Sequence, residues 1–240
     1  REQIAGSGFN VTRLSAVDGR GRPLSDFPDY DGPTCRKRYG RDMFSGEIGC
    51  HLSHVKAAEA FLATDAPMAL VLEDDMAIRP GGWAVLHALI AWLEAEPPTG
   101  WELVNLVKPP RNRPLPLATL RAEGASATLY RAPYFPVTTT ALLWSRAGAK
   151  RFLAETRRPQ GPVDHVLRRQ MAISGGGLAL DPPPFEVTGA PSDINAASAH
   201  HGHVRRLIGP EAWAEFWRQL EVMRLARATR TRLTTGATFR

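Results

Sequence analysis

One stretch of the chain, MALVLEDD at residues 68–75, most constrains how the chain can fold. Five apolar residues run directly into three carboxylates, Glu73, Asp74 and Asp75. An apolar run of this length predicts a strand covered on both faces, as in parallel sheets flanked by helices. In such sheets ligands bind beyond the carboxyl ends of the strands, where these acids fall. Because three like charges in one turn repel, the sequence predicts a divalent cation there, together with a nucleotide diphosphate.

The size and composition of the chain indicate one α/β domain with a trailing helix. Of its 240 residues, 43% are hydrophobic, which is enough for one large core. We place the domain at residues 1–205 and an amphipathic basic helix with a tail at residues 206–240. No run reaches the roughly 18 apolar residues that cross a bilayer, and the first ten residues lack an apolar signal core. With only two cysteines, a reducing, cytoplasmic location is expected.

Periodicity and turn-forming residues predict the elements around the acidic strand. Strands are expected at residues 11–17, 101–107, near 127–136 and before 146, and helices at 47–63, 83–94, from 146 onward and at 161–172. The Gly-, Pro- and Asp-rich residues 21–40 and the proline-rich residues 108–117 are expected to be loops. A nucleotide-binding α/β fold normally begins with a strand, whereas this chain begins on what looks like the end of a helix. We therefore expect the first strand to be missing.

The net charge of +6 and the pI of about 9.8 favour anionic partners. Basic residues cluster late in the chain, at 205–207 and 224–233, which indicates a surface patch. The expected helix at residues 210–225 gathers large apolar side chains on one face, namely Trp213, Phe216, Trp217, Leu220 and Met223. We favour docking of this face on the core. Contact with anionic lipid headgroups at the inner face of the membrane is the alternative.

The acidic strand end is the main candidate site, because Mg²⁺ and Mn²⁺ prefer carboxylate oxygens together with substrate phosphates. A cation held there would bridge the two phosphates of a nucleotide-sugar and stabilise the departing diphosphate. Acidic residues are also common at strand ends as turn formers. The second candidate is Asp164, which could accept the proton of an acceptor hydroxyl. The alternative is an ordinary aspartate at the start of a helix.

Several histidines are weaker candidates. His165, beside Asp164, could act as a base. His51 and His54 lie three residues apart on one helical face and are interpreted as helix surface or as the wall of a nucleotide-sugar pocket. The late group from His200 to His203 could complete a metal shell, although a solvated loop is the commoner use of such a cluster.

Residues 44–62, FSGEIGCHLSHVKAAEAFL, followed by ALVLEDDMAI at residues 69–78, resemble glycosyltransferase family 25. This family contains lipooligosaccharide galactosyltransferases and collagen hydroxylysine galactosyltransferases. The combination of G-E-x-G-C-x-x-S-H with an apolar strand that ends in L-E-D-D carries the resemblance. Supporting segments lie at 13–19, 138–153, 162–167 and 191–194. The resemblance covers most of residues 10–195.

The resemblance implies a GT-A-like fold, with a Rossmann-type mixed sheet flanked by helices. It also implies a nucleotide-sugar donor that is usually UDP-galactose, a cation such as Mn²⁺ or Mg²⁺, and inversion at the sugar carbon. The acceptor it implies is a glycan or glycolipid such as lipopolysaccharide. Glu73 and Asp75 match the metal motif, and the positions that match the donor motif are Glu47, Ser53, His54, Glu73 and Asp74. Asp164 matches the later Pro-x-Asp position. The nucleotide-binding I-N-L strand with which family members open is not evident here.

Two other functions stay open from the sequence. A metal-dependent phosphotransferase or phosphohydrolase could use the same acids, but LEDDMA lacks the D-x-D-x-T nucleophile pattern. A nucleic-acid-binding module would suit the basic charge, but the aromatic residues gather on one face instead of alternating with arginines. We therefore expect an inverting glycosyltransferase with no specific nucleic-acid partner.

Overall fold

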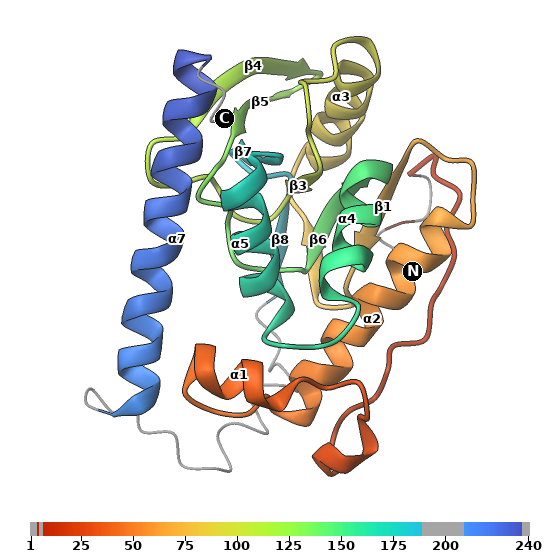
Figure 1. Ribbon diagram of the computed structural model, residues 1–240. Coiled ribbons are helices and arrows are strands. Elements are labelled where there is room, and N and C mark those ends of the chain that lie inside the picture. Colours follow the sequence, from red (N-terminus) through yellow and green to blue (C-terminus); the bar gives the residue numbers. More distant parts are fainter. Residues whose placement is uncertain (1–3, 5–6, 189–208, 237–240) are drawn as a thin grey trace.

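The computed structural model describes residue 4, residues 7–188 and residues 209–236 (Figure 1). Most of its strands form a six-stranded mixed sheet. The strand order is β1 (Met68–Leu72), β6 (Ala141–Ser145), β3 (Leu103–Asn105), β7 (Gly177–Asp181), β5 (Ala125–Arg131) and β4 (Leu115–Ala122). A separate two-stranded ribbon pairs β2 (Met76–Ile78) with β8 (Phe185–Val187). The helices are α1 (Gly32–Tyr39), α2 (Ser45–Leu62), α3 (Gly82–Ala95), α4 (Arg146–Thr156), α5 (Val163–Ser174) and α7 (Pro210–Thr235). The expected α/β fold is confirmed.

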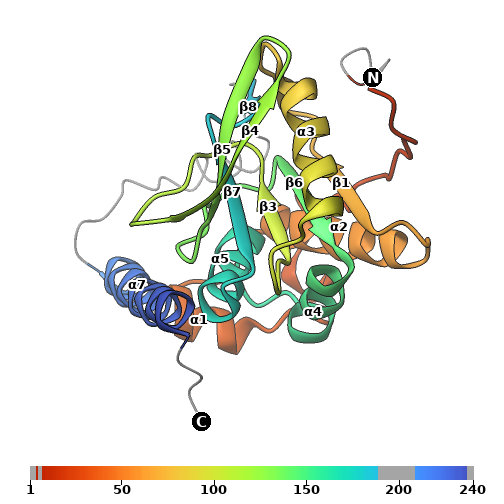
Figure 2. The same cartoon turned by 90° about the horizontal axis from the view of Figure 1, so that it is seen from above.

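Helices cover both faces of the sheet (Figure 2). On one face α3 contributes Leu86 and Leu89 to a core that includes Val104, Leu143 and Leu178 from the strands. On the other face α2, α4 and α5 form a second core against the remaining strand side chains, with Val55, Phe61, Phe152, Leu167 and Met171. Successive strand residues point to opposite faces, so strands that lie between two helical layers must be apolar throughout.

Strand β1 is apolar on both faces, as expected, because Leu70 packs on the α3 side while Val71 packs on the α2 side. The expected mixed sheet is confirmed, but the parallel pairing that the apolar run suggested for this strand is wrong. β1 lies at the edge of the sheet and pairs only with β6, antiparallel, so its residues are half-buried. An apolar run in the sequence indicates that both faces of the strand are covered. It does not indicate the direction of the neighbouring strands, which depends on how the strands are connected.

The sheet brings the acidic strand end next to the start of β6. β1 and β3 both run antiparallel to β6, and β7 runs parallel to β3, so the carboxyl ends of β1, β3 and β7 share one edge. In this register Leu72 pairs with Ala141. Residues 138–140, which immediately precede β6, therefore lie beside residues 73–75, which immediately follow β1.

Two expectations for the N-terminal part are wrong. Residues 11–17 form no strand; instead the backbone N–H of Val17 donates to the Ser53 hydroxyl of α2, 2.9 Å away. Helix α1 lies inside the segment expected to be loop, where Asp31 caps it by accepting from the backbone N–H of Thr34 at 3.0 Å. Three consecutive basic residues, 36–38, interrupt the apolar periodicity of this short helix.

Two further differences lie in the hairpin β4–β5 and in the packing of α2. β4 begins within the segment expected to be a proline-rich loop, and Pro116 is tolerated because β4 is an edge strand. In α2, a Cβ atom at Gly49 would come within 2.4 Å of the Val17 carbonyl oxygen. Only glycine allows the N-terminal segment to cross α2 this closely, which fixes the helix that carries several candidate residues.

Helix α7 lies against α5 and α1 (Figure 2) and packs on α5 through small residues. Its aromatic residues are exposed to solvent. Val222, Ala226 and Thr229 are its buried residues, whereas Trp213 and Trp217 are 60% and 56% exposed. The prediction that the aromatic face docks on the core is therefore wrong, because the small residues allow a closer approach to α5. Among the described residues, no helix is both long enough and apolar enough to cross a membrane.

Candidate functional site

The three predicted acids form the turn between β1 and β2, and backbone hydrogen bonds hold this turn on both sides. The Glu73 N–H donates to the Thr140 carbonyl oxygen, and the Thr188 N–H donates to the Asp75 carbonyl oxygen, each at 2.8 Å. The acids are thus fixed at the carboxyl edge of the sheet, as their position after an apolar strand predicts.

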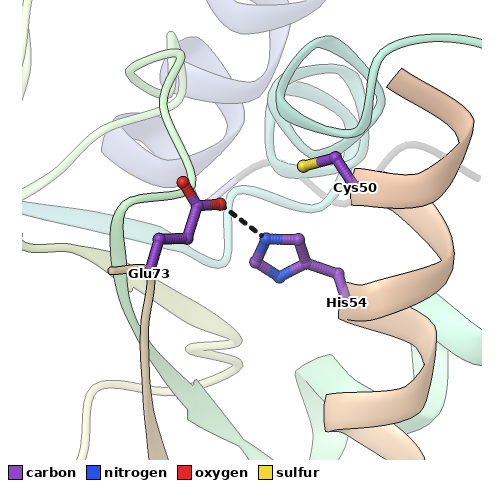
Figure 3. A group of neighbouring side chains, drawn as sticks. All are labelled: Cys50, His54 and Glu73. Atoms are coloured by element: carbon purple, nitrogen blue, oxygen red, sulfur yellow. Dashed lines mark hydrogen bonds and ion pairs between the residues drawn. The ribbon is translucent and has the colours of Figure 1, made fainter. Parts of the chain in front are cut away.

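Glu73 points back toward α2, where His54 binds it (Figure 3). The ring Nε2 of His54 donates to Glu73 Oε1 at 3.0 Å. Burial acts to raise the pKa of Glu73, but the hydrogen bond and charge of His54, with the hydroxyls of Thr139 and Thr140, hold it below its usual value. His54 is buried, so the alternative that it lies on the helix surface is wrong. Its role as a wall of the nucleotide-sugar pocket stays a prediction.

Cys50, one turn before His54 on α2, completes this group. The ligand-type atoms of Cys50, His54 and Glu73 lie within 4.8 Å of one another. Burial, reinforced first by Glu73 and then by Asp164, raises the pKa of the Cys50 thiol to about 12. The thiol is therefore protonated at neutral pH. Both carboxylates therefore act on the same thiol, although Glu73 and Asp164 are distant in sequence.

Asp164 lies in the first turn of α5, as predicted, and its side chain is half-buried. Its Oδ1 accepts a hydrogen bond from the backbone N–H of His165 at 2.8 Å. The pKa of His165 is lowered, chiefly by burial, so its ring is neutral at pH 7 and packs edge-on against Tyr39. The structure therefore places an oriented carboxylate at position 164 next to a neutral imidazole at position 165.

Asp75 has the features of a cation ligand. Burial, then the charges of Glu73 and Asp74, raise its pKa above the usual value. Its Oδ1 is buried and has no hydrogen-bond partner within the described part of the chain. Asp74 is exposed. A buried carboxylate oxygen without a partner, flanked by two further carboxylates, fits a hard divalent ion such as Mn²⁺ or Mg²⁺.

Two of the residues predicted to bind the nucleotide-sugar have clear roles in the fold. Both carboxylate oxygens of Glu47 accept hydrogen bonds from the Arg41 guanidinium group, at 2.7 and 2.8 Å. Glu47 also accepts a hydrogen bond from the Phe44 N–H at the start of α2. Ser53 accepts from the Val17 N–H and donates to the Gly49 carbonyl oxygen. Their assignment to the nucleotide-sugar stays a prediction.

The sequence did not single out Cys50, Thr139 or Thr140 as site residues. A polar triplet directly before a buried strand, at 138–140, was the available signal, because antiparallel pairing places it at the end of β1. His51, by contrast, is fully buried and its Nε2 lies 2.7 Å from the Thr156 carbonyl oxygen, a structural contact. The group from His200 to His203 lies outside the described residues.

Comparison with known proteins points to one family. Residues 1–94 match the profile of glycosyltransferase family 25, which carries the description LPS biosynthesis protein. A human protein named inactive glycosyltransferase 25 family member 3 is 30% identical over 163 residues, which cover 64% of this chain and 26% of that protein. A bovine protein named probable inactive glycosyltransferase 25 family member 3 has the same identity and coverage.

An Anopheles gambiae protein named glycosyltransferase 25 family member is 35% identical over 103 residues, which cover 40% of this chain and 17% of that protein. The matched regions thus span about a quarter or less of these relatives. The resemblance seen in the sequence is confirmed by these matches.

Proposed function

We infer that the chain belongs to glycosyltransferase family 25, and we propose that it transfers galactose from UDP-galactose to a hydroxyl group with inversion at the sugar carbon. The observation that carries the proposal is that Glu73 and Asp164 both act on the half-buried Cys50 thiol, with Asp75 at the same end of β1. Transfer to a hydroxyl is assisted by a cation, held by carboxylates, that stabilises the leaving diphosphate, and by a base that accepts the acceptor proton.

The human and bovine relatives are named inactive, so family membership supports a transferase without establishing that this chain is active. The proposal therefore rests on residues of this chain. Asp75 retains a buried oxygen without a partner, and Asp164 is present in the first turn of α5.

Asp75 and Glu73 would hold Mn²⁺ or Mg²⁺, and the bound ion would neutralise charge on the departing diphosphate. His54 orients Glu73 by its 3.0 Å hydrogen bond, and the hydroxyls of Thr139 and Thr140 act on the same carboxylate. This arrangement keeps Glu73 ionised. We assign Asp74, which is exposed at the turn, to the nucleotide-sugar together with Glu73.

Asp164 would accept the proton of the acceptor hydroxyl. The hydroxyl oxygen forms its bond to C1 of the sugar as the bond from C1 to the diphosphate oxygen breaks. The hydrogen bond from the His165 N–H fixes the orientation of the Asp164 carboxylate for this step. A single displacement of this kind inverts the configuration at C1.

A panel of nucleotide-sugars tests this function directly. We expect UDP-galactose to bind and to release UDP in the presence of Mn²⁺, and EDTA to abolish release, because the ion stabilises the leaving group. UDP-glucose and GDP-mannose serve as matched comparisons, and UDP is measured by a coupled assay. Absence of binding to every nucleotide-sugar, together with metal-dependent hydrolysis of p-nitrophenyl phosphate, would favour the phosphohydrolase instead.

For the acceptor we propose a lipid-linked glycan such as lipopolysaccharide, reached at the cytoplasmic face of an anionic membrane. Trp213, Phe216 and Trp217 pack edge-to-face on exposed α7, and Arg224 and Arg227 are exposed on the same helix. Aromatic side chains beside arginines suit the interface of a bilayer that carries negative charge. The net charge of +6 adds long-range attraction.

Vesicle binding tests this contact. We expect the double variant Trp213→Ser with Trp217→Ser to bind vesicles that contain phosphatidylglycerol about tenfold more weakly than wild type in co-sedimentation. Leu117→Ser, an exposed apolar residue of β4, is the control and should bind like wild type. Equal binding of the wild type and the double variant would refute the contact.

A further inference from the structure

Four arginines from three helices surround one surface pocket beside Asp164. Arg38 comes from α1, Arg168 and Arg169 from α5, and Arg218 from α7. The lining also includes His165, the residue after the proposed base. The pocket is a shallow depression of about 10 Å³, so a ligand would lie at its mouth. A separate neighbouring cavity of about 300 Å³ shares Arg38 and Arg169 with it, but is not lined by Arg168 or Arg218. The group of four is called the arginine pocket below.

The arginine pocket contains more positive charge than nearby carboxylates neutralise. Glu221 of α7 binds both Arg38 and Arg169, at 2.6 and 3.0 Å, so one carboxylate serves two guanidinium groups. In the described part of the chain, neither Arg168 nor Arg218 has a carboxylate within 4.0 Å. Within the described ranges, these two guanidinium groups thus have no ion-pair partner, although Asp164 acts on Arg168 and Glu215 acts on Arg218 at longer range.

The two guanidinium groups without carboxylates are held in place by aromatic rings. Arg168 lies 4.5 Å from the centroid of the Tyr134 ring and donates through Nε to the Phe135 carbonyl oxygen at 2.6 Å. Arg218 lies 4.6 Å from the centroid of the Tyr39 ring. Its hydrogen-bond donors find no protein acceptor among the described residues, so they remain available to a ligand.

Burial makes this arrangement costly without an anion. The pKa of Arg168 is lowered mainly by burial, which outweighs the opposing effects of Tyr134 and Asp164, and Arg218 adds repulsion. Burial is also the main cause of the lowered pKa of Arg218, against the opposing effects of Tyr39 and Glu215. Removing cations from water is unfavourable unless an opposite charge compensates. Planar guanidinium groups match phosphate and carboxylate oxygens well, so a bound anion would supply that compensation.

We propose that the arginine pocket binds a phosphate or carboxylate group carried by the acceptor. His165, which lines the pocket, directly follows Asp164, and Arg168 lies one turn after Asp164 on α5, so the pocket is on the side of the proposed base. An anionic group held there would orient the acceptor so that its hydroxyl faces Asp164. Anion binding itself is independent of the proposed function, whereas the assignment to the acceptor rests on it.

Titration with inorganic phosphate tests the anion site in the protein alone, in EDTA and at constant ionic strength. We expect Arg168→Gln and Arg218→Gln to raise the Kd for phosphate about tenfold or more, because each removes a charge-assisted hydrogen bond. Arg121→Gln, an exposed arginine of β4, is the control for the loss of one charge and should leave the Kd unchanged. Equal weakening in all three variants, or no phosphate binding by wild type, would overturn the site.

Arg218→Gln also separates loss of phosphate binding from loss of folding. Arg218 makes no hydrogen bond to the described residues, so its replacement should not disturb the fold. We expect its Tm in phosphate-free buffer to stay within about 3 °C of wild type, while the rise in Tm that phosphate causes in wild type disappears. A rise in Tm equal to that of wild type would count against the pocket.

Transfer assays distinguish the source of the anion. With matched acceptors that differ by one phosphate, Arg218→Gln should raise the KM of the phosphorylated acceptor alone, about tenfold, and leave kcat and the KM of the nucleotide-sugar unchanged. An increased KM for the nucleotide-sugar would instead assign the pocket to its diphosphate and overturn the acceptor assignment. If wild type transfers no sugar at all, the proposed function fails, while the phosphate titration still decides the anion site.

Discussion

Replacing Asp75 by Asn should reduce kcat for UDP-sugar turnover by at least about 100-fold in saturating Mn²⁺. The substitution keeps the shape of the side chain but removes the negative charge of the carboxylate. The Oδ1 atom of this carboxylate is buried and has no hydrogen-bond partner among the described residues. It therefore removes the strongest candidate for a direct metal ligand. Turnover is measured as UDP release, and Mn²⁺ binding is measured separately as the shift in Tm on adding the ion.

The same substitution should stabilise the metal-free protein at neutral pH. The pKa of Asp75 is raised in the fold, so its favourable contribution to stability is present below the usual value of 3.8 and is lost as the pH rises through the raised pKa. Above that pKa the ionised wild type carries an electrostatic cost that Asp75→Asn lacks. In EDTA the difference in Tm between variant and wild type should therefore increase with pH across this window.

Asp65→Asn provides the control, because Asp65 is exposed at the other end of β1. It should keep wild-type turnover and the shift in Tm that Mn²⁺ causes. If Asp75→Asn turned over the UDP-sugar at the wild-type rate, the proposed metal site would be wrong. A variant that loses turnover but also unfolds at a lower Tm in EDTA would show a structural role for Asp75 in place of the expected relief of repulsion.

Asp164→Asn is expected to lower kcat by about 100- to 10,000-fold while the affinity for the nucleotide-sugar changes little. Asparagine can still accept the hydrogen bond from the His165 N–H, so the first turn of α5 should be preserved. It cannot accept the acceptor proton. Single-turnover measurements with saturating nucleotide-sugar isolate the chemical step, and calorimetry gives the affinity.

The exposed Asp29 offers a matched control, and Asp29→Asn should behave like wild type. The pH profile adds a readout that a structural role would not produce, because the limb of kcat that reports ionisation of the base should vanish in Asp164→Asn. If nucleotide-sugar binding is lost instead and kcat is unchanged, Asp164 belongs to the binding pocket and the assignment as base is wrong.

The sequence predicted the parts of this site that lie within one element, but not those that depend on packing between elements. The acidic end of β1 and the position of Asp164 in a first helical turn followed from local patterns. The contact of His54 with Glu73 did not, because it requires α2 to lie against the end of β1. The roles of Thr139 and Thr140 required the antiparallel partner of β1, which periodicity cannot identify.

The sequence also failed to predict which face of helix α7 is buried. Its apolar residues allow two helical faces, one with large aromatic residues and one with Val222, Ala226 and Thr229. Hydrophobicity alone favoured burial of the larger face. The structure buries the smaller one, where Thr229 donates to the Ala172 carbonyl oxygen at 2.8 Å and close approach to α5 is possible.

The position of β6 between β1 and β3 has a consequence for folding kinetics. Leu72 pairs with Ala141 although β2, α3, β3, β4 and β5 lie between them in the chain, so this pairing closes a long stretch of chain. The hairpin β4–β5, by contrast, closes over a few residues. Long loops cost more entropy to close and form later. We therefore expect the hairpin to appear early during refolding and the acidic edge to assemble late. A ligand that binds this edge should then slow unfolding while leaving the folding rate almost unchanged.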